Sequence, residues 1–316
     1  MARLGDLSAA ALPTGEQYTL RAGPYEAVVV ETGGGLRTLT YDGDHLLHGY
    51  REEEVVTGGR GQLLAPWPNR IDGGRYDFGG RSHQLDLSEP TTGNAIHGLT
   101  RWESWQVHAA RPPAEHRVDL RHRLHPHPGY PHVLDLVVTY ELHDTDGLTV
   151  TIEARNAGGS PAPYGVGFHP YLTTGAATVD DCLLSSPART RLPTDERGLP
   201  LGREPVEGTD DDLRSGALIG ARKLDGPYAD LERDADGLAW ARLTDPESGR
   251  GVALWLDAAW DYLQLYTGDK LRPNPRSGLA VEPMSCPPNA FVSGDGLVVL
   301  EPGDSVQHAF GIVAIR

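Results

Sequence analysis

The sequence predicts an all-β protein, a large antiparallel β-sandwich, from three observations. Short runs of alternating apolar and polar residues recur along its 316 residues. The segments between them carry much of the 39 glycines and 25 prolines, which break helices and form turns. No long helical spacing, heptad or solenoid repeat interrupts this pattern. Because no composition shift marks a linker, residues 1–316 are expected to form one domain.

The most regular runs predict a β-hairpin between residues 134 and 155. In LDLVVTYEL (134–142) and LTVTIEAR (148–155), every even-numbered residue is apolar or aromatic, so one face of each strand is expected to be buried. The connection contains Asp144, Thr145, Asp146 and Gly147, residue types that favour turns. Two alternating runs joined by so short a turn predict antiparallel pairing.

Other strands are expected on both sides of this hairpin. In chain order, the runs are 26–32, 105–110, 241–245, 251–257, 262–268, 278–283, 297–302 and 308–316. Residues 207–226 are expected to hold a short helix. Cys182 and Cys286 have no metal-binding spacing and are expected to be small buried residues.

The charge of the chain restricts its partners. It has 28 Lys and Arg against 44 Asp and Glu, a formal net charge of -16. Such a surface repels nucleic acids and anionic membranes, so we expect neither and favour a neutral or cationic small molecule. The N-terminal stretch lacks the apolar run of a signal peptide, and no run of about 20 apolar residues occurs. The sequence therefore predicts a cytoplasmic protein.

A guanidinium in a rigid segment is the first candidate for a binding group. In APWPNRI, Arg70 follows Asn69 and a stretch stiffened by Pro66 and Pro68, with Trp67 between them. The planar fork of donors can bind two neighbouring hydroxyls or a carboxylate. On position alone, a structural salt bridge is the alternative for Arg70.

Two histidines and a glutamate lie in similarly constrained segments. His97 in NAIHGL precedes Gly98, which allows close approach to the backbone. His169 in GFHPYL precedes Pro170, which favours extended backbone and fixes the direction of the ring. Glu282 ends the apolar run GLAV and enters a proline-rich loop, a plausible pocket floor. Taken singly, the alternatives are a hydrogen-bonded loop or core histidine and an exposed strand end.

The stretches APWPNRI, NAIHGL, GFHPYL and AVEPMSCPPN, in this order, resemble the aldose 1-epimerases, or galactose mutarotases. An ordered set of four is more specific than any one of them. The resemblance implies the galactose mutarotase-like β-sandwich, in agreement with the strand pattern. It also implies an isomerase without metal or cofactor, whose small-molecule substrate is a free aldose such as galactose or glucose.

By position, the resemblance assigns the general base to Glu282 and the general acid to His169. Interconversion of the α and β anomers requires one proton to leave the C1 hydroxyl while another reaches the ring oxygen O5. The ring then opens, and closure on the other face gives the second anomer. A carboxylate and an imidazolium on opposite sides of the C1–O5 bond perform both transfers.

The resemblance also implies residues that hold the sugar. These are Arg70, His97, Asp230, Trp67 and Tyr171. Arg70, His97 and Asp230 would contact hydroxyls, and the two aromatic rings would face the C–H surface of the sugar.

The aspartate is one of four in LDGPYADLERDADG. Asp230 lies just after an aromatic residue and before an apolar one, whereas Asp225, Asp234 and Asp236 resemble turn carboxylates. The histidine-containing stretch that usually follows this aspartate in the family is missing, so a neighbouring aspartate remains the alternative.

Other functions remain open. The acidic pair Asp230 and Glu282 fits a glycoside hydrolase, which ordinarily uses two carboxylates. A β-sandwich without catalysis fits a sugar-binding module. A hexose 6-phosphate is a variant substrate for the mutarotase, but the negative chain and the run EEEVV favour a neutral sugar. The native aldose and the oligomeric state stay open.

Overall fold

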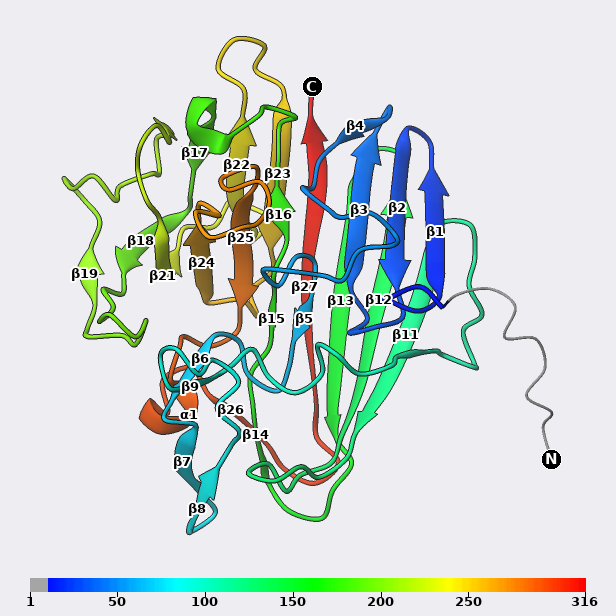
Figure 1. Cartoon of the computed structure of the whole chain (residues 1–316), viewed down its shortest axis with the longest axis vertical. Coiled ribbons are helices and arrows are strands. Elements are labelled where there is room, and N and C mark those ends of the chain that lie inside the picture. Colours follow the sequence, from blue (N-terminus) through cyan, green and yellow to red (C-terminus); the bar gives the residue numbers. More distant parts are fainter. Residues whose placement is uncertain (1–10) are drawn as a thin grey trace.

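The computed structural model describes residues 11–316, and three antiparallel sheets of four, nine and eight strands dominate it (Figure 1). The first ten residues, which belong to the expected domain and to the N-terminal stretch, lie outside the described residues. The all-β prediction is confirmed. The only helices within residues 11–316 are a 3-10 turn, η1 (Val179–Asp181), and the single-turn α1 (Ala290–Ser293).

The four-stranded and nine-stranded sheets contain the N-terminal strands and the predicted hairpin. The first runs β1 (Gln17–Ala22), β2 (Tyr25–Val30), β3 (Leu36–Tyr41), β4 (Asp44–His45). The second runs β10 (Gln106–Val107), β11 (Arg117–Leu124), β12 (Leu134–His143), β13 (Gly147–Asn156), β27 (Ser305–Ile315), β23 (Gly251–Leu256), β22 (Ala239–Thr244), β17 (Leu183–Ser185), β20 (Ala217–Leu218).

The hairpin prediction is confirmed by β12 and β13. They pair antiparallel, with Leu136 opposite Ala154 and Tyr140 opposite Val150. The even-numbered residues that the alternation assigned to one face are buried in both strands. Each of the other expected runs overlaps a strand of the structure.

The eight-stranded sheet carries most of the segments that the sequence analysis singled out. It runs β19 (Glu204–Pro205), β18 (Ala188–Arg191), β21 (Asp225–Leu231), β24 (Tyr262–Tyr266), β25 (Leu279–Met284), β15 (Gly167–Phe168), β5 (Leu63–Leu64), with β16 (Tyr171–Leu172) also paired to β25.

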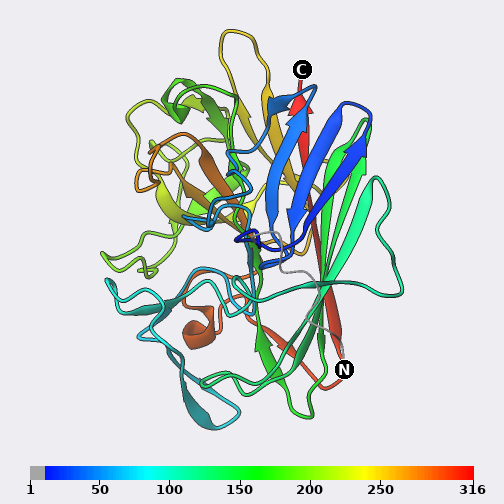
Figure 2. The ribbon, with the colours of Figure 1, turned by 45° about the vertical axis from the view of Figure 1, so that its right-hand side comes forward.

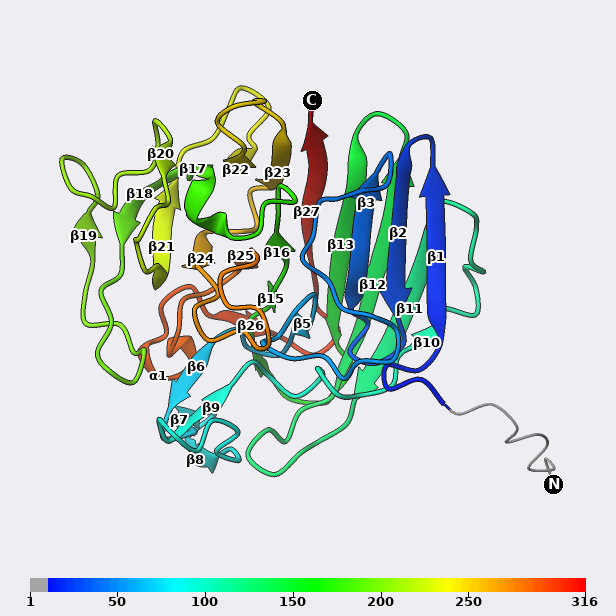
Figure 3. The same cartoon turned by 45° about the horizontal axis from the view of Figure 1, so that its top comes forward.

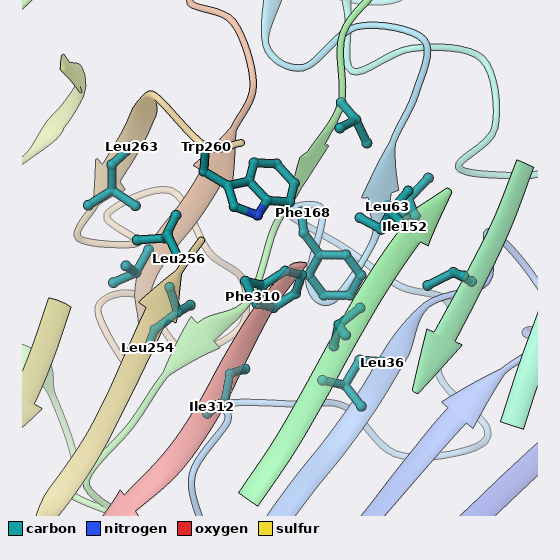
Figure 4. Packing of buried hydrophobic residues seen from close by; sticks show 14 of the residues in the cluster. Leu36, Leu63, Ile152, Phe168, Leu254, Leu256, Trp260, Leu263, Phe310 and Ile312 are labelled. Atoms are coloured by element: carbon teal, nitrogen blue, oxygen red, sulfur yellow. The ribbon is translucent and has the colours of Figure 1, made fainter. Parts of the chain in front are cut away.

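The nine-stranded sheet forms one layer of a sandwich, and the two other sheets cover its inner face. The four-stranded sheet lies against β11 and β12 (Figure 2). The eight-stranded sheet packs over β23 and β27, where the rings of Phe168 and Phe310 are 5.0 Å apart and Trp260 closes the cluster (Figure 4). This apolar layer fixes the position of β15, and with it the segment that follows Phe168.

Three two-stranded ribbons extend the sandwich at one end (Figures 1 and 3). They pair β6 (Arg70–Asp72) with β9 (Asn94–Ile96), β7 (Arg75–Phe78) with β8 (Arg81–Gln84), and β14 (Ala162–Tyr164) with β26 (Val298–Leu300). The β6–β9 ribbon lies beside the ends of β24 and β25 and carries the APWPNRI and NAIHGL segments toward them.

The prediction of a short helix within residues 207–226 is wrong. This segment forms turns and the short strand β20, which pairs with β17. Gly216 has φ +82°, a left-handed conformation that a helix does not contain, and the Asp212 carboxylate binds the Arg214 side chain instead of supporting a helix.

Cys182 and Cys286 are buried and free, as expected. None of the helices in the described part of the chain has the length and hydropathy needed to cross a bilayer.

Candidate active site

A cavity of about 420 Å³ lies where the β6–β9 ribbon meets the eight-stranded sheet. The polar residues that line it include Arg70, His97, His169, Tyr171, Asp225 and Glu282. Five of these six are predicted site residues, so the structure brings together segments that are up to 212 residues apart (282 − 70).

The pairing of three strands places His169 against Glu282. β15 and β16 flank His169, and both pair with β25. Because Tyr171 is opposite Ala280, the residue two positions before Tyr171 comes opposite the residue two positions after Ala280. His169 Nε2 lies 3.3 Å from Glu282 Oε1, and the two side chains are 6% and 3% exposed.

Burial disfavours the charged form of both members of this pair. It lowers the pKa of His169 to about 3, with the charge of Arg101 acting in the same direction. Burial, and then repulsion by Asp225, raises the pKa of Glu282 well above its ordinary value. Both shifts disfavour the ion pair and favour the form in which the carboxyl keeps the proton and the imidazole is neutral. Within residues 11–316, Glu282 Oε2 and His169 Nδ1 have no hydrogen-bond partner, so one buried polar atom of each side chain is unsatisfied.

Asp225 lies beside Glu282 on the same face of the sheet. Gln264 pairs with Glu282 across β24 and β25, and its Nε2 donates a hydrogen bond of 3.2 Å to the Asp225 carboxylate. Asp225 is opposite Tyr266 in the β21–β24 register, and Tyr266 lines the cavity too. Burial raises the pKa of Asp225. Two carboxyl groups of raised pKa thus share one cavity.

Asp230, the predicted substrate-binding aspartate, lies outside the cavity. Its side chain is 56% exposed and lies 3.9 Å from Arg203. Residues an odd number of positions apart in a strand face opposite sides of the sheet, which separates Asp230 from Asp225. The structure therefore places Asp230 outside this cavity and Asp225, one of the alternatives, among its lining residues.

The β6–β9 ribbon joins Asn69 and His97. The His97 backbone N–H donates to the Asn69 carbonyl at 2.8 Å, and the Asn69 backbone N–H donates to His97 Nδ1 at 3.2 Å. Since Nδ1 accepts, Nε2 carries the hydrogen of the neutral ring, and burial lowers the pKa of His97. His97 thus offers a neutral N–H donor. Both residues have positive φ, a strain of roughly 1–3 kcal/mol each that is typical of functional sites.

The expected close approach at Gly98 is present. A Cβ at Gly98, whose φ is +69°, would lie 2.1 Å from the Ala65 carbonyl oxygen, and Leu99 N–H donates to that same oxygen. The glycine therefore locks the NAIHGL segment to the APWPNRI segment.

The remaining predicted residues divide between the cavity and the core. Arg70 lines the cavity and also forms the salt bridge considered for it, with Glu89. Tyr171 lines the cavity, and its ring stacks on His169 at 5.0 Å. Trp67 is 2% exposed and packs against Phe291, so it supports the site from the core and offers no face to the cavity. No group of three or more potential metal ligands occurs among the described residues.

Comparisons with known proteins show the family of the chain and agree with its fold. A family model described as aldose 1-epimerase matches residues 16–312. The uncharacterised Escherichia coli protein YihR is 39% identical over 303 residues, which cover 96% of this chain and 94% of YihR. The C. elegans GalM/aldose epimerase homologue superposes with a TM-score of 0.82 at 19% identity, covering 95% of this chain and 100% of that one. Galactose 1-epimerase from Lactobacillus acidophilus superposes with a TM-score of 0.80 at 24% identity, covering 95% of each chain.

Proposed function

This chain belongs to the aldose 1-epimerase family and is an isomerase, and on that premise we propose that it interconverts the α and β anomers of a free aldose by acid–base ring opening. The observation that carries the proposal is the contact of 3.3 Å between His169 Nε2 and Glu282 Oε1 on the wall of a sugar-sized cavity. Each of the two side chains also has one buried polar atom, Glu282 Oε2 and His169 Nδ1, without a hydrogen-bond partner among the described residues.

The proposed reaction uses the single proton of this pair. Sugar hydroxyls in the cavity replace lost hydration and favour the ionised form, in which the proton has moved from Glu282 to His169. The Glu282 carboxylate then takes the proton of the C1 hydroxyl while the His169 imidazolium protonates O5, and the C1–O5 bond breaks. Rotation about C1–C2 and the reverse transfers give the other anomer and restore both groups.

The binding roles follow from donor and acceptor types. Arg70 and the Nε2–H of His97 donate to sugar hydroxyls, and Asp225 accepts from them. Tyr171 forms part of the apolar wall. With Asp230 outside the cavity, its acidic pair is Asp225 and Glu282, and release of new reducing ends from glycosides would support the glycoside hydrolase alternative.

A phosphorylated aldose is the second candidate substrate. Arg101, Lys270 and Arg272 line the cavity, and among the described residues none of them forms a salt bridge, unlike Arg70. Such free cations suit an anionic substituent. The net charge of the chain favours the neutral sugar.

Polarimetry or one-dimensional NMR starting from a pure anomer tests the function. We expect faster equilibration than in buffer for at least one member of a panel of glucose, galactose and their 6-phosphates. If no member of the panel equilibrates faster, the mutarotase proposal fails. Sugar affinity without acceleration would support the binding-module alternative.

The pH dependence of kcat/KM is expected to be a broad bell. Activity requires one proton on the pair, so it falls as the pH rises through the raised pKa of Glu282, where that proton is lost. It also falls toward about pH 3, where His169 takes up a second proton and no base remains. Rates by NMR between about pH 2 and 10, corrected for spontaneous mutarotation, check this. A rate that climbs steadily to pH 10 would contradict it.

Two aspartate variants test the corrected binding residue. We expect Asp225→Asn to lower kcat/KM by roughly one to two decades, the worth of a hydrogen bond to a charged group. Asp230→Asn, on an exposed part of the same strand, should stay within about twofold of wild type. The reverse order of effects in the same NMR assay would return the role to Asp230.

A further inference from the structure

Glu89 holds the guanidinium of Arg70 from the side. Arg70 Nε donates to Glu89 Oε2 at 2.8 Å and Nη2 donates to Oε1 at 2.9 Å, a bidentate pair. Both side chains are about one-fifth exposed or less. The Thr92 hydroxyl donates to Glu89 Oε2, and the Thr92 backbone N–H donates to the backbone carbonyl of Glu89. The carboxylate is therefore itself fixed.

Gly198 closes over the other end of the guanidinium. A Cβ there would lie 2.5 Å from Arg70 Nη1, and the φ of +78° suits glycine. The neighbouring Arg197 ties this segment to the ribbon through Asp72 at 2.6 Å and Asn94 at 2.8 Å. Segments that are distant in sequence thus enclose the Arg70 side chain.

This arrangement controls both the direction and the charge of Arg70. The pair uses two of the five guanidinium N–H bonds, and a third, on Nη1, donates to Asn69 Oδ1 at 3.4 Å, which leaves two for a ligand. Asp225 and Glu282, in the same cavity, also attract Arg70. Without Glu89, the nearest compensation for the Arg70 charge would be these two carboxyl groups, which the reaction needs free.

We propose that Glu89 is a positioning residue, which aims Arg70 at a sugar hydroxyl and keeps it away from Asp225 and Glu282. This inference rests on the proposed function, and nothing in the sequence around Glu89 marks it. A bidentate partner of fixed geometry lowers the entropy lost when Arg70 binds its ligand.

A double-mutant cycle in the mutarotation assay tests the proposal. Glu89→Gln is expected to raise KM roughly 10- to 100-fold, with a smaller change in kcat. Glu89→Asp should restore part of the loss. Once Arg70 is replaced by Ala, adding Glu89→Gln should cost nothing further, because Glu89 acts only through Arg70. Additive losses, or an unchanged KM in Glu89→Gln, would overturn the proposal.

Two further variants separate positioning from folding. Gly198→Ala displaces Arg70 while Glu89 stays in place, and it should raise KM in the same way as Glu89→Gln. Glu141→Gln is the control, because Glu141 forms a partly buried salt bridge with Arg117 in the sandwich, away from the cavity, and the kinetics of this variant should equal those of the wild type.

The NMR signal of the Arg70 Nε–H tests the proposal without a measurement of catalysis. We expect a slowly exchanging signal in the wild type that is lost in Glu89→Gln. If the wild type equilibrates no sugar, the proposed function fails, whereas Glu89 is still judged by this signal and by the affinity for galactose in calorimetry. A signal that persists unchanged in Glu89→Gln would refute the positioning role.

Discussion

Replacing Glu282 by glutamine is expected to lower kcat for mutarotation by roughly two to four decades, the usual worth of a positioned proton-transfer group. Glutamine has nearly the shape of glutamate and can still contact His169, but it cannot take the proton of the C1 hydroxyl. KM should change by less than about threefold, because the hydroxyl still finds an acceptor. Exchange NMR at equilibrium measures the residual rate above the spontaneous reaction.

A second buried carboxylate provides the control for Glu282→Gln. Asp119 in β11 is 1% exposed and accepts hydrogen bonds from Arg117 and Thr139, far along the nine-stranded sheet. Asp119→Asn should lower the melting temperature and leave kcat unchanged. Glu282→Gln should fold as well as wild type, since its carboxyl is buried at a cost. A variant Glu282→Gln within tenfold of wild-type kcat would remove Glu282 from the mechanism.

The strands could be predicted because their signal is local. Alternation in 134–142 and 148–155 reports which face of each strand is buried, and a short turn fixes their pairing. The partner of β13 on its other side is β27, about 150 residues away, and no local pattern identifies it. The same holds for the pairing of β16 with β25, which sets His169 opposite Glu282. Local sequence patterns therefore could not predict these two strand pairings.

The site could be predicted where a motif carries it and not elsewhere. Arg70, His97, His169 and Glu282 each lie in a stiff, recognisable segment, and all four line the cavity. The aspartate was misplaced because local context was weighed without strand parity. The register of β21, in which Pro227 pairs with Gln264, puts Asp225 on the face of Glu282, and only the fold reveals that register.

Trp67 and Glu89 are two residues whose positions relative to the cavity could not be predicted from the local sequence. An aromatic residue between two prolines can line a cavity or fill the core. Trp67 packs against Phe291 and therefore belongs to the core. Glu89 lies in a polar segment typical of a surface loop, and only the fold brings its carboxylate to Arg70.

His169→Asn is expected to lower kcat by a similar two to four decades, and its accompanying effects distinguish it from Glu282→Gln. Asparagine cannot accept the proton that Glu282 holds in the free enzyme, so no group remains to protonate O5. The matched control is His308→Asn. This histidine in β27 is equally buried, with a pKa lowered to about 4 by burial, but it packs beside Trp260 and does not line the cavity.

His308→Asn should reduce stability and leave kcat intact. His169→Asn should lose activity, and its acid limb should move from about pH 3 to the raised pKa of Glu282, because no imidazole remains to receive the proton of Glu282. In the wild type that limb reports the second protonation of the pair, which needs the imidazole of His169. Added imidazole should restore part of the rate, since the smaller side chain leaves room beside Glu282 and Tyr171. An unchanged acid limb in His169→Asn, together with a rate within tenfold of wild type, would mean that another group in the cavity donates the proton to O5. His97 would then be tested next, because its Nδ1 accepts from Asn69 and its Nε2–H points away from Asn69.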